Sequence, residues 1–358
     1  MTAANPSTNA ASTLQVAGVV SFYMCSALVM VFVNKAVLNG SPDIPLLFLL
    51  IQLLIAVVLL HATALITKRV EIPKYDYNTA KSLVPVVLVN IIGLVFNTLC
   101  LRDVEASFFQ IARGLNLPLT IFVSSVVTHS VPSRQVIFSA IIVTVGFLLG
   151  VAPTSSLPIT ATPSLLSLLY GVLSSLFIAF HAVLIKSSLP YCNNSTIELA
   201  YWTNAGSAIF LLPFVFLHGE ISTLQSLMSS TGWNGGLFLW GTVVTGVFGF
   251  LLCIAGLLSI KVTGPITHMF SSAARSVLQT LLGVWIFSDV LTVNRGISIT
   301  VILGGTLLYT WLKSGPAHPP PQRRQTDVEA AVPLMGKEDM GGDSSSRQSS
   351  EKMVGQDR

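Results

Sequence analysis

Ten long apolar segments constrain the fold of this chain, since each is close to the roughly 20 residues that a helix needs to cross the hydrocarbon core of a bilayer. Lipid offers the backbone no hydrogen-bond partners, so a crossing segment must be a helix or part of a closed barrel, and apolar runs of this length favour helices. The segments lie at about 14–38, 45–67, 80–101, 105–127, 135–152, 164–186, 197–217, 235–260, 264–288 and 294–313. The sequence therefore predicts an all-α membrane protein with ten transmembrane helices. Very short turns are expected at Arg102–Glu105 and Lys261–Gly264.

The composition agrees with a lipid-embedded chain and argues against several kinds of partner. Hydrophobic residues make up 52% of the 358 residues and charged residues only 9%, whereas soluble domains carry about 25% charged residues. The net charge of +4 comes from scattered Lys and Arg, so a nucleic-acid partner, which would need a clustered basic face, is not expected. The four cysteines show no metal-binding spacing, and we interpret them as buried apolar thiols, with no metal or other cofactor.

The positions of Lys and Arg in the short connections predict the orientation of the chain. With a cytosolic N-terminus, the cytosolic connections hold Lys68, Arg69, Lys74, Lys81, Arg134, Lys186 and Lys261, and the opposite face holds Lys35, Arg102 and Arg295. Both termini are then cytosolic. Residues 1–13 form a short N-terminal tail, and residues 314–358, rich in Pro, Ser and Gly, are expected to form a disordered C-terminal tail.

The chain also shows signs of an internal duplication. A linker at 153–163 separates five predicted spans at 14–152 from five at 164–313. An odd number of spans in each half places the halves in opposite orientations, which is the inverted-repeat plan of many transporters. The fourth spans of the halves carry "FQIARGLNLPL" and "SSAARSVLQTL", so that Arg113 and Arg275 occupy equivalent places.

These two arginines are the strongest functional signal, because an Arg at the centre of a membrane helix costs on the order of 2.5–3.5 kcal/mol on insertion scales. An intramembrane ion pair is one explanation, but no Asp or Glu lies deep in any predicted span. Snorkelling into water is a second. Binding of an anion is favoured, because guanidinium groups hold phosphate oxygens in a bidentate manner. The spans show no nucleophile and base motif or paired acids, so an intramembrane enzyme, with catalytic residues, is not expected.

Other polar and aromatic residues in the spans are candidates for the rest of such a site. In "YWTN", Thr203 and Asn204 are placed to recognise a base and Tyr201 and Trp202 to stack on it, although interhelical hydrogen bonds and an interfacial aromatic belt explain them equally well. Pro118, a turn beyond Arg113, is expected to bend its helix. The remaining candidates are Lys35 for phosphate, gating or snorkelling, and Tyr23, Thr267, His268 and Ser272 for the substrate.

The order and spacing of these motifs resemble the nucleotide-sugar transporters of the drug/metabolite transporter superfamily. The likeness runs from about Leu14 to Lys313 and includes "ALVMVFVNK", "FFQIARGLN", "YWTN" and "PITHMFSSAARSVLQ". Within the superfamily the GDP-fucose transporters are the most similar group. The resemblance implies a Golgi protein, or alternatively one of the endoplasmic reticulum, that exchanges a nucleotide sugar for a nucleoside monophosphate by alternating access. It also leaves room for a homodimer.

The resemblance assigns roles to some residues and departs from the family pattern at others. Tyr23 corresponds to a substrate-facing tyrosine and Arg113 to a basic residue of the fourth span. The "YWTN" stretch lies where GDP-sugar transporters have FYNN, so Asn204 keeps one base-reading amide and Thr203 replaces the other. The GALNK motif of GDP-mannose transporters is absent, since "SAARS" stands in its place, with Ser276 at its final Lys. GDP-mannose is therefore disfavoured, while another GDP-sugar, a UDP-sugar and a triose phosphate stay open.

Overall fold

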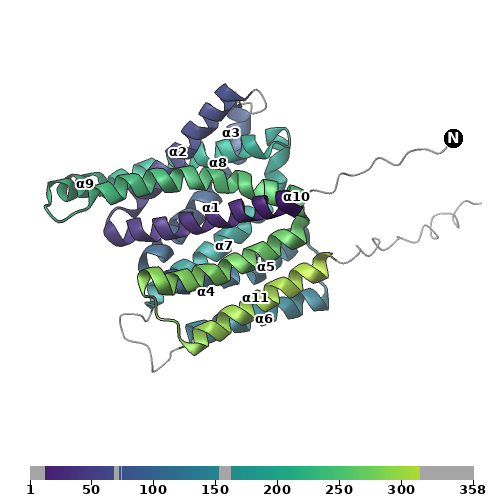
Figure 1. The fold of residues 1–358 in the computed structure, drawn as a ribbon. Coiled ribbons are helices and arrows are strands. Elements are labelled where there is room, and N and C mark those ends of the chain that lie inside the picture. The colour runs from purple at the N-terminus through teal and green to yellow at the C-terminus, as the bar shows by residue number, and fades with distance from the viewer. Residues whose placement is uncertain (1–12, 68–71, 74, 153–162, 315–358) are drawn as a thin grey trace, which may run out of the picture. The chain divides into compact units, whose positions relative to one another are not determined.

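The computed structural model describes residues 13–67, 72–73, 75–152 and 163–314, with side chains left aside at 13–14, 186, 253–254, 256–270 and 314. Within these ranges the regular structure is entirely helical (Figure 1). The helices are α1 (Thr13–Gly40), α2 (Pro45–Ile66), α3 (Tyr77–Asp103), α4 (Ala106–Ala112), η1 (Arg113–Leu115), α5 (Asn116–Thr128), α6 (Arg134–Val151), α7 (Leu165–Ser188), η3 (Leu189–Cys192), α8 (Thr196–Leu217), α9 (Glu220–Ser229), α10 (Gly235–Phe287) and α11 (Val293–Ser314).

The predicted fold class is confirmed, because nine helical segments in the described ranges are long and apolar enough to cross a membrane. The predicted span at 105–127 corresponds to α4, η1 and α5 together, and the short turn predicted at Arg102–Glu105 joins α3 to α4. The short helix α9 was not anticipated. The count of ten stays a prediction, because the span expected at 264–288 begins where α10 side chains are left aside.

The helical assignment of α10 runs over 53 residues with no separate turn at Lys261–Gly264. The chain must nevertheless reverse between residues 252 and 271, as the contacts with α1 below show, so the exact place of the predicted turn stays a prediction. A straight helix of that length would measure about 80 Å, far more than the roughly 30 Å of a hydrocarbon core. Pro265, which follows the expected turn, lies within the element. Proline is tolerated in membrane helices where neighbouring groups satisfy the backbone carbonyl that it frees.

Contacts with α1 show that α10 has two arms of opposite direction, which we call the first arm (Gly235–Leu252) and the second arm (residues 271–287). Along α1 the residue numbers rise as those of the first arm fall, and they rise together with those of the second arm (Figure 1). The contacts are Val37 with Gly241, Met30 with Gly249, Tyr23 with Ser272, and Phe32 with Phe287. The second arm therefore crosses back beside the first.

The packing partners repeat between the two halves of the chain. α3 packs on α7 and α8, as the first arm of α10 packs on α1 and α2. α5 packs on α7 as the second arm packs on α1, while α2 packs on α8 and α6 on α11. These paired contacts agree with the predicted inverted repeat, with one half in α1–α6 and the other in α7–α11, and the division into five spans each stays a prediction.

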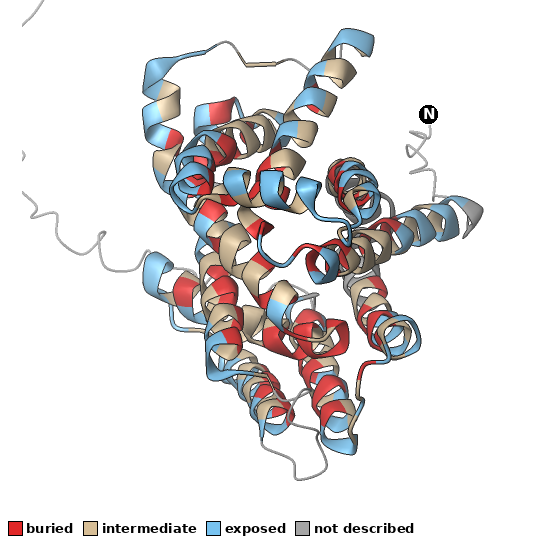
Figure 2. Ribbon diagram, turned by 90° about the vertical axis from the view of Figure 1, so that its left-hand side faces the viewer, coloured by how far each residue is buried: buried red, intermediate tan, exposed pale blue. Residues whose placement is uncertain are grey.

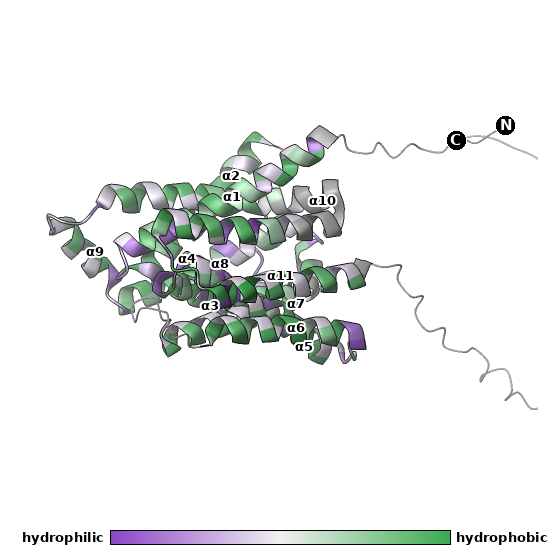
Figure 3. Cartoon of the chain, turned by 60° about the horizontal axis from the view of Figure 1, so that its bottom comes forward, coloured by the Kyte–Doolittle hydropathy of each residue, from purple (hydrophilic) through white to green (hydrophobic). Residues whose placement is uncertain are grey.

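The outer faces of the helices suit lipid rather than water. Figure 2 shows buried residues on helix faces that meet one another and exposed residues on the outward faces. Figure 3 shows those outward faces to be largely apolar. Large apolar side chains are among the most exposed of all, including Val58, Phe122, Leu148, Phe214 and Trp240. Contiguous apolar surface on this scale marks an interaction surface, and around helices of this length it is the lipid-facing side.

Candidate functional site

Arg113 lies where its membrane span loses regular α-helical form. α4 ends at Ala112, Arg113 opens the 3₁₀ turn η1, and α5 begins at Asn116. Pro118 explains the break, because its ring lacks an N–H and clashes with the carbonyl of Gly114, four residues earlier. The helix thus loses regular α-helical form beside Arg113, and the bend predicted at Pro118 stays a prediction.

The Arg113 guanidinium packs on its own segment and forms no ion pair with any residue whose side chain is described. Its central carbon lies 5.6 Å from the ring centroid of Phe109. A Cβ at Gly114 would collide with Ile302 of α11. A glycine here therefore lets α11 approach the backbone of the break closely.

Arg275 meets Tyr23 and Ser272, and the structure thus brings three of the predicted site residues together. Its guanidinium lies 5.8 Å from the ring centroid of Tyr23, whose hydroxyl is 3.0 Å from the Ser272 hydroxyl. Tyr23 is only 8% exposed. The Nε atom of Arg275 is buried with no hydrogen-bond partner.

The two guanidinium groups, which we call the arginine pair, lie close enough for their charges to interact. The segments that carry them are joined by Gln110, whose amide nitrogen donates to the Ser276 hydroxyl over 2.8 Å. Within the described part of the chain no carboxylate forms an ion pair with either arginine. Two like charges inside a membrane protein repel each other and are poorly solvated, so this arrangement is suited to an anion.

Lys35 is not brought to the arginine pair. It lies twelve residues after Tyr23 on α1, which corresponds to about 18 Å along a helix. Its side chain is 6% exposed, and the ammonium group donates to the carbonyl oxygens of Leu101 (2.9 Å) and Arg102 (3.0 Å) at the end of α3. A cation at these carbonyls stabilises a helix C-terminus.

The "YWTN" residues use their polar groups within their own helix. The Thr203 hydroxyl donates to the carbonyl oxygens of Leu199 and Ala200, and the Asn204 amide nitrogen donates to that of Ala200 over 2.7 Å. Tyr201 and Trp202 lie in an aromatic group, with ring centroids 5.4 Å from His61 and 6.1 Å from Tyr75 respectively. No described contact joins this stretch to the arginine pair.

The two sets of candidates lie at different depths in the bundle. Gly171 of α7 lies against both Cys100 of α3 and Ala112, the residue before Arg113. Gly206, two residues after "YWTN" on α8, packs instead against Val87 of α3. Thirteen residues of α3 separate these levels, or about 20 Å along the helix. A ligand that reached from one set to the other would have to be elongated.

Two predicted site residues, Thr267 and His268, have backbones within α10 but side chains outside the described residues. Their roles stay predictions. Sequence reasoning also missed Gln110 and Asn116, which lie three residues on either side of Arg113. That spacing places side chains on one helix face and is the signal that could have identified them.

A second charged group holds the start of α4 and the end of α3, and of its members only Lys35 was a candidate from the sequence. Asp289 accepts a hydrogen bond from the backbone N–H of Ser107 over 2.7 Å. Arg295, with 2% of its side chain exposed, pairs with Glu105 and donates to the Val290 carbonyl over 2.7 Å. We call Lys35, Glu105, Asp289 and Arg295 the anchor cluster, since each ties a helix end to another segment.

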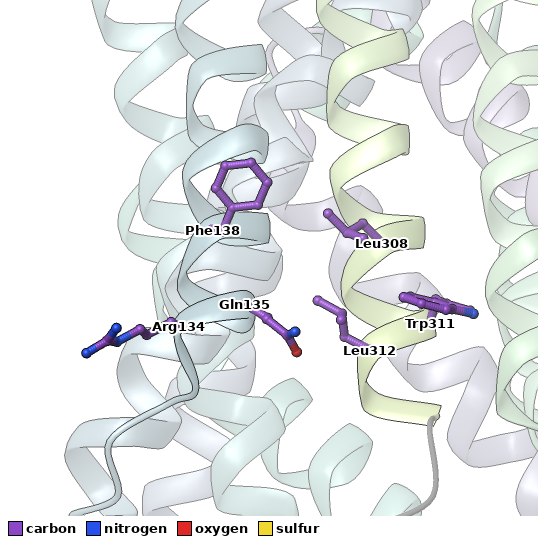
Figure 4. A pocket seen from close by; sticks show the side chains of 6 residues that line it. All are labelled: Arg134, Gln135, Phe138, Leu308, Trp311 and Leu312. Carbon is purple, nitrogen blue, oxygen red and sulfur yellow. The ribbon is translucent and has the colours of Figure 1, made fainter.

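The structure also describes a shallow groove of about 400 Å³ between α6 and α11, away from both charged groups. It is lined by Arg134, Gln135, Phe138, Leu308, Trp311 and Leu312. Figure 4 shows Arg134 extending away from the other lining side chains, so the groove presents mainly apolar groups. It lacks the converging polar groups of a phosphate site.

These features define a polytopic α-helical membrane protein with two arginines in its spans that form no ion pair with the described residues. The chain belongs to the Triose-phosphate Transporter family, whose model matches residues 14–310. It is 28% identical over 304 residues to "GDP-fucose transporter 1" of Dictyostelium discoideum, covering 82% of this chain and 80% of that one. It is 27% identical to "GDP-fucose transporter, Golgi" of Drosophila melanogaster, covering 89% and 96%. An uncharacterized transporter of Schizosaccharomyces pombe is 31% identical, covering 82% and 74%.

Proposed function

We propose that the protein is a nucleotide-sugar antiporter that carries GDP-fucose into the Golgi lumen in exchange for GMP, by alternating access. Two similar proteins are named as GDP-fucose transporters, and one of them as a Golgi protein. The motif order of the chain points to the same group. Both termini would be cytosolic, as the Lys and Arg positions predict. The bundle would open the arginine pair alternately to the cytosol and to the lumen.

The observation that carries the proposal is the arginine pair itself. Arg113 and Arg275 lie on segments that the Gln110–Ser276 hydrogen bond joins, and they have no carboxylate partner in the described residues. A diphosphate supplies two adjacent anionic groups, and each guanidinium can bind one through two parallel hydrogen bonds. The substrate would thus provide the counter-charge that the protein lacks.

The rest of an elongated nucleotide would extend along the bundle from the arginine pair. Tyr23 lies beside Arg275 and bonds to Ser272, and these two residues would bind the sugar. Asn204 and Thr203, about 20 Å away along α3, would bind the base. Their side chains bond to carbonyl oxygens of their own helix, so base recognition requires them to exchange these partners.

Exchange follows from the chemistry of the two ligands. The departing nucleoside monophosphate also presents a dianion, which would neutralise the same guanidinium groups. An unliganded bundle must keep two like charges desolvated while it changes conformation, which is costly. Each substrate therefore favours the transition that resets the carrier for the other.

Transport of another organophosphate is the alternative, either a UDP-sugar or a triose phosphate. One residue favours it, because Thr203 stands at the position of the first asparagine in the FYNN motif of GDP-sugar transporters. It is also favoured by the family model, which takes its name from triose-phosphate transporters.

The two functions are separated by counterflow into proteoliposomes that contain the purified full chain. Vesicles are loaded with GMP, UMP, inorganic phosphate or buffer, and uptake of labelled GDP-fucose, a UDP-sugar and a triose phosphate is measured in each. Stimulation of GDP-fucose uptake by internal GMP alone is the expected result. Equal uptake with and without GMP would refute the proposed exchange, and stimulation by UMP or phosphate would support the alternatives.

A further inference from the structure

One polar atom near Arg113 has no hydrogen-bond partner among the residues that the structure describes. The side-chain oxygen Oδ1 of Asn116 is buried and accepts no hydrogen bond. A buried polar group without a partner is destabilising, and most such groups in folded proteins are satisfied. Most polar side chains elsewhere in the spans follow that rule, for example Thr120, whose hydroxyl donates to the backbone oxygen of Asn116 over 2.6 Å.

The broken helix places Asn116 on the same side as Arg113. The 3₁₀ turn spans Arg113–Leu115 and Asn116 follows it. Side chains three residues apart eclipse one another in a 3₁₀ turn, so Asn116 lies one turn from Arg113, about 5–6 Å along the axis. Gln110, three residues before Arg113, flanks the arginine on the other side but is bonded to Ser276.

The unpaired atom also has a different chemistry from the groups around it. The arginine pair offers only donors, which match the oxygen atoms of a phosphate. A carbonyl oxygen accepts and cannot bind an ionised phosphate. The ligand group beside Asn116 must therefore carry a donor, and the donors nearest the phosphates of a nucleotide sugar are the hydroxyl groups of its hexose and its ribose.

From this arrangement we infer that Asn116 accepts a hydrogen bond from a hydroxyl group of the substrate, adjacent to the phosphates held by Arg113 and Arg275. The inference rests on the proposed function, since it assigns a further binding residue to the same site. It makes Asn116 a residue that distinguishes glycosylated or ribosylated phosphates from inorganic phosphate.

The test compares Asn116→Leu with the wild type and with Thr120→Val, a matched control that removes a satisfied polar group one turn further along. Affinities for GDP-fucose, GDP and 2′,3′-dideoxy-GDP are measured by titration calorimetry on the purified full chain. Loss of one neutral hydrogen bond is expected to weaken binding by about two- to tenfold. If the donor is a hexose hydroxyl, Asn116→Leu should lose affinity for GDP-fucose alone. If it is a ribose hydroxyl, the variant should lose affinity for GDP-fucose and GDP but not for the dideoxy nucleotide.

Thermal stability supplies the second measurement. Because Leu fills the site without leaving a buried polar atom unpaired, Asn116→Leu should melt at the same temperature as the wild type or higher. Unchanged affinities for all three ligands would overturn the inference, as would an equal loss for all three, which would show that Asn116 acts through the structure. A wild-type chain that binds none of them would instead contradict the proposed function.

Discussion

Two groups of buried charges in this bundle differ in whether their arginines have a carboxylate partner among the described residues. In the anchor cluster, Arg295 is buried against Glu105 and the Val290 carbonyl, and its guanidinium lies 5.1 Å from the centroid of Phe108. In the arginine pair, Arg113 and Arg275 are packed on aromatic rings in the same manner but have no carboxylate partner within the described residues. The arginines of both groups contact aromatic rings, and the groups differ in whether a carboxylate counter-ion is present.

The difference indicates which charges serve the fold and which serve a ligand. A buried charge that only stabilises structure is strongly destabilised when it lacks a partner. Each charge of the anchor cluster has a hydrogen-bond partner, at the start of α4 and the end of α3. The charges of the arginine pair, further along the same spans, have no ion-pair partner among the described residues. The comparison makes opposite predictions for substitutions in the two groups.

The largest effect is expected from neutralising the arginine pair. Each charge-assisted contact to phosphate contributes about 1.5–3 kcal/mol, so the double variant Arg113→Gln/Arg275→Gln should lower exchange by at least about 100-fold. The melting temperature should not fall, because no ion pair is broken and the repulsion between the arginines is removed. Proteoliposome exchange and thermal unfolding measure both quantities. Retained exchange in the double variant would exclude the arginines as the phosphate site.

The anchor cluster should show the reverse behaviour. Glu105→Gln leaves the Arg295 charge without its carboxylate, which is expected to lower the free energy of unfolding by about 3 kcal/mol. Neutralising both partners in Glu105→Gln/Arg295→Gln should recover most of that loss, since no uncompensated charge is left. Folded protein of either variant should bind GDP-fucose as the wild type does. Loss of affinity without loss of stability would place this cluster in the binding site.

A substitution of Lys35 tests whether this residue belongs to the anchor cluster or to the phosphate site of the arginine pair. Lys35→Met keeps the apolar part of the side chain and removes the donor to the Leu101 and Arg102 carbonyls. A loss of about 1 kcal/mol in unfolding free energy, with less than a twofold change in the KM for GDP-fucose, is expected of an anchor. A tenfold higher KM at unchanged stability would restore the phosphate role predicted from the sequence.

The same contrast explains which features could be predicted from the sequence. The spans follow from the length of the apolar segments. Arg113 and Arg275 were found because the cost of burying a charge within a span can be estimated without knowing which residues pack against it. The break beside Arg113 follows from Pro118 for the same reason. The carbonyl partners of Lys35 and the unpaired oxygen of Asn116 depend on what tertiary packing places next to them. A lysine near a span end has the same sequence pattern whether it caps a helix, reaches the membrane surface or binds a phosphate.

The smallest effect is expected at Asp76, a carboxylate that caps a helix in water and contrasts with buried Asp289. Its oxygen accepts hydrogen bonds from the Thr79 hydroxyl (2.7 Å) and backbone N–H (2.9 Å) at the start of α3. These bonds, led by that of the Thr79 side chain, lower the pKa of Asp76 below its ordinary value of 3.8. A lowered folded-state pKa means that the stabilisation is complete above the ordinary value and is lost as the pH falls through the folded value.

Asp76→Asn should therefore melt slightly below the wild type at neutral pH, and the difference should vanish as the solution is acidified through that range. Asp289→Asn, which weakens a buried cap, should lower the melting temperature more. Thermal unfolding of the three proteins across the acidic range measures both differences. An equal loss for the two variants would show that burial adds nothing to the cap on α4, and the anchor cluster would then lose its distinction from an ordinary helix cap.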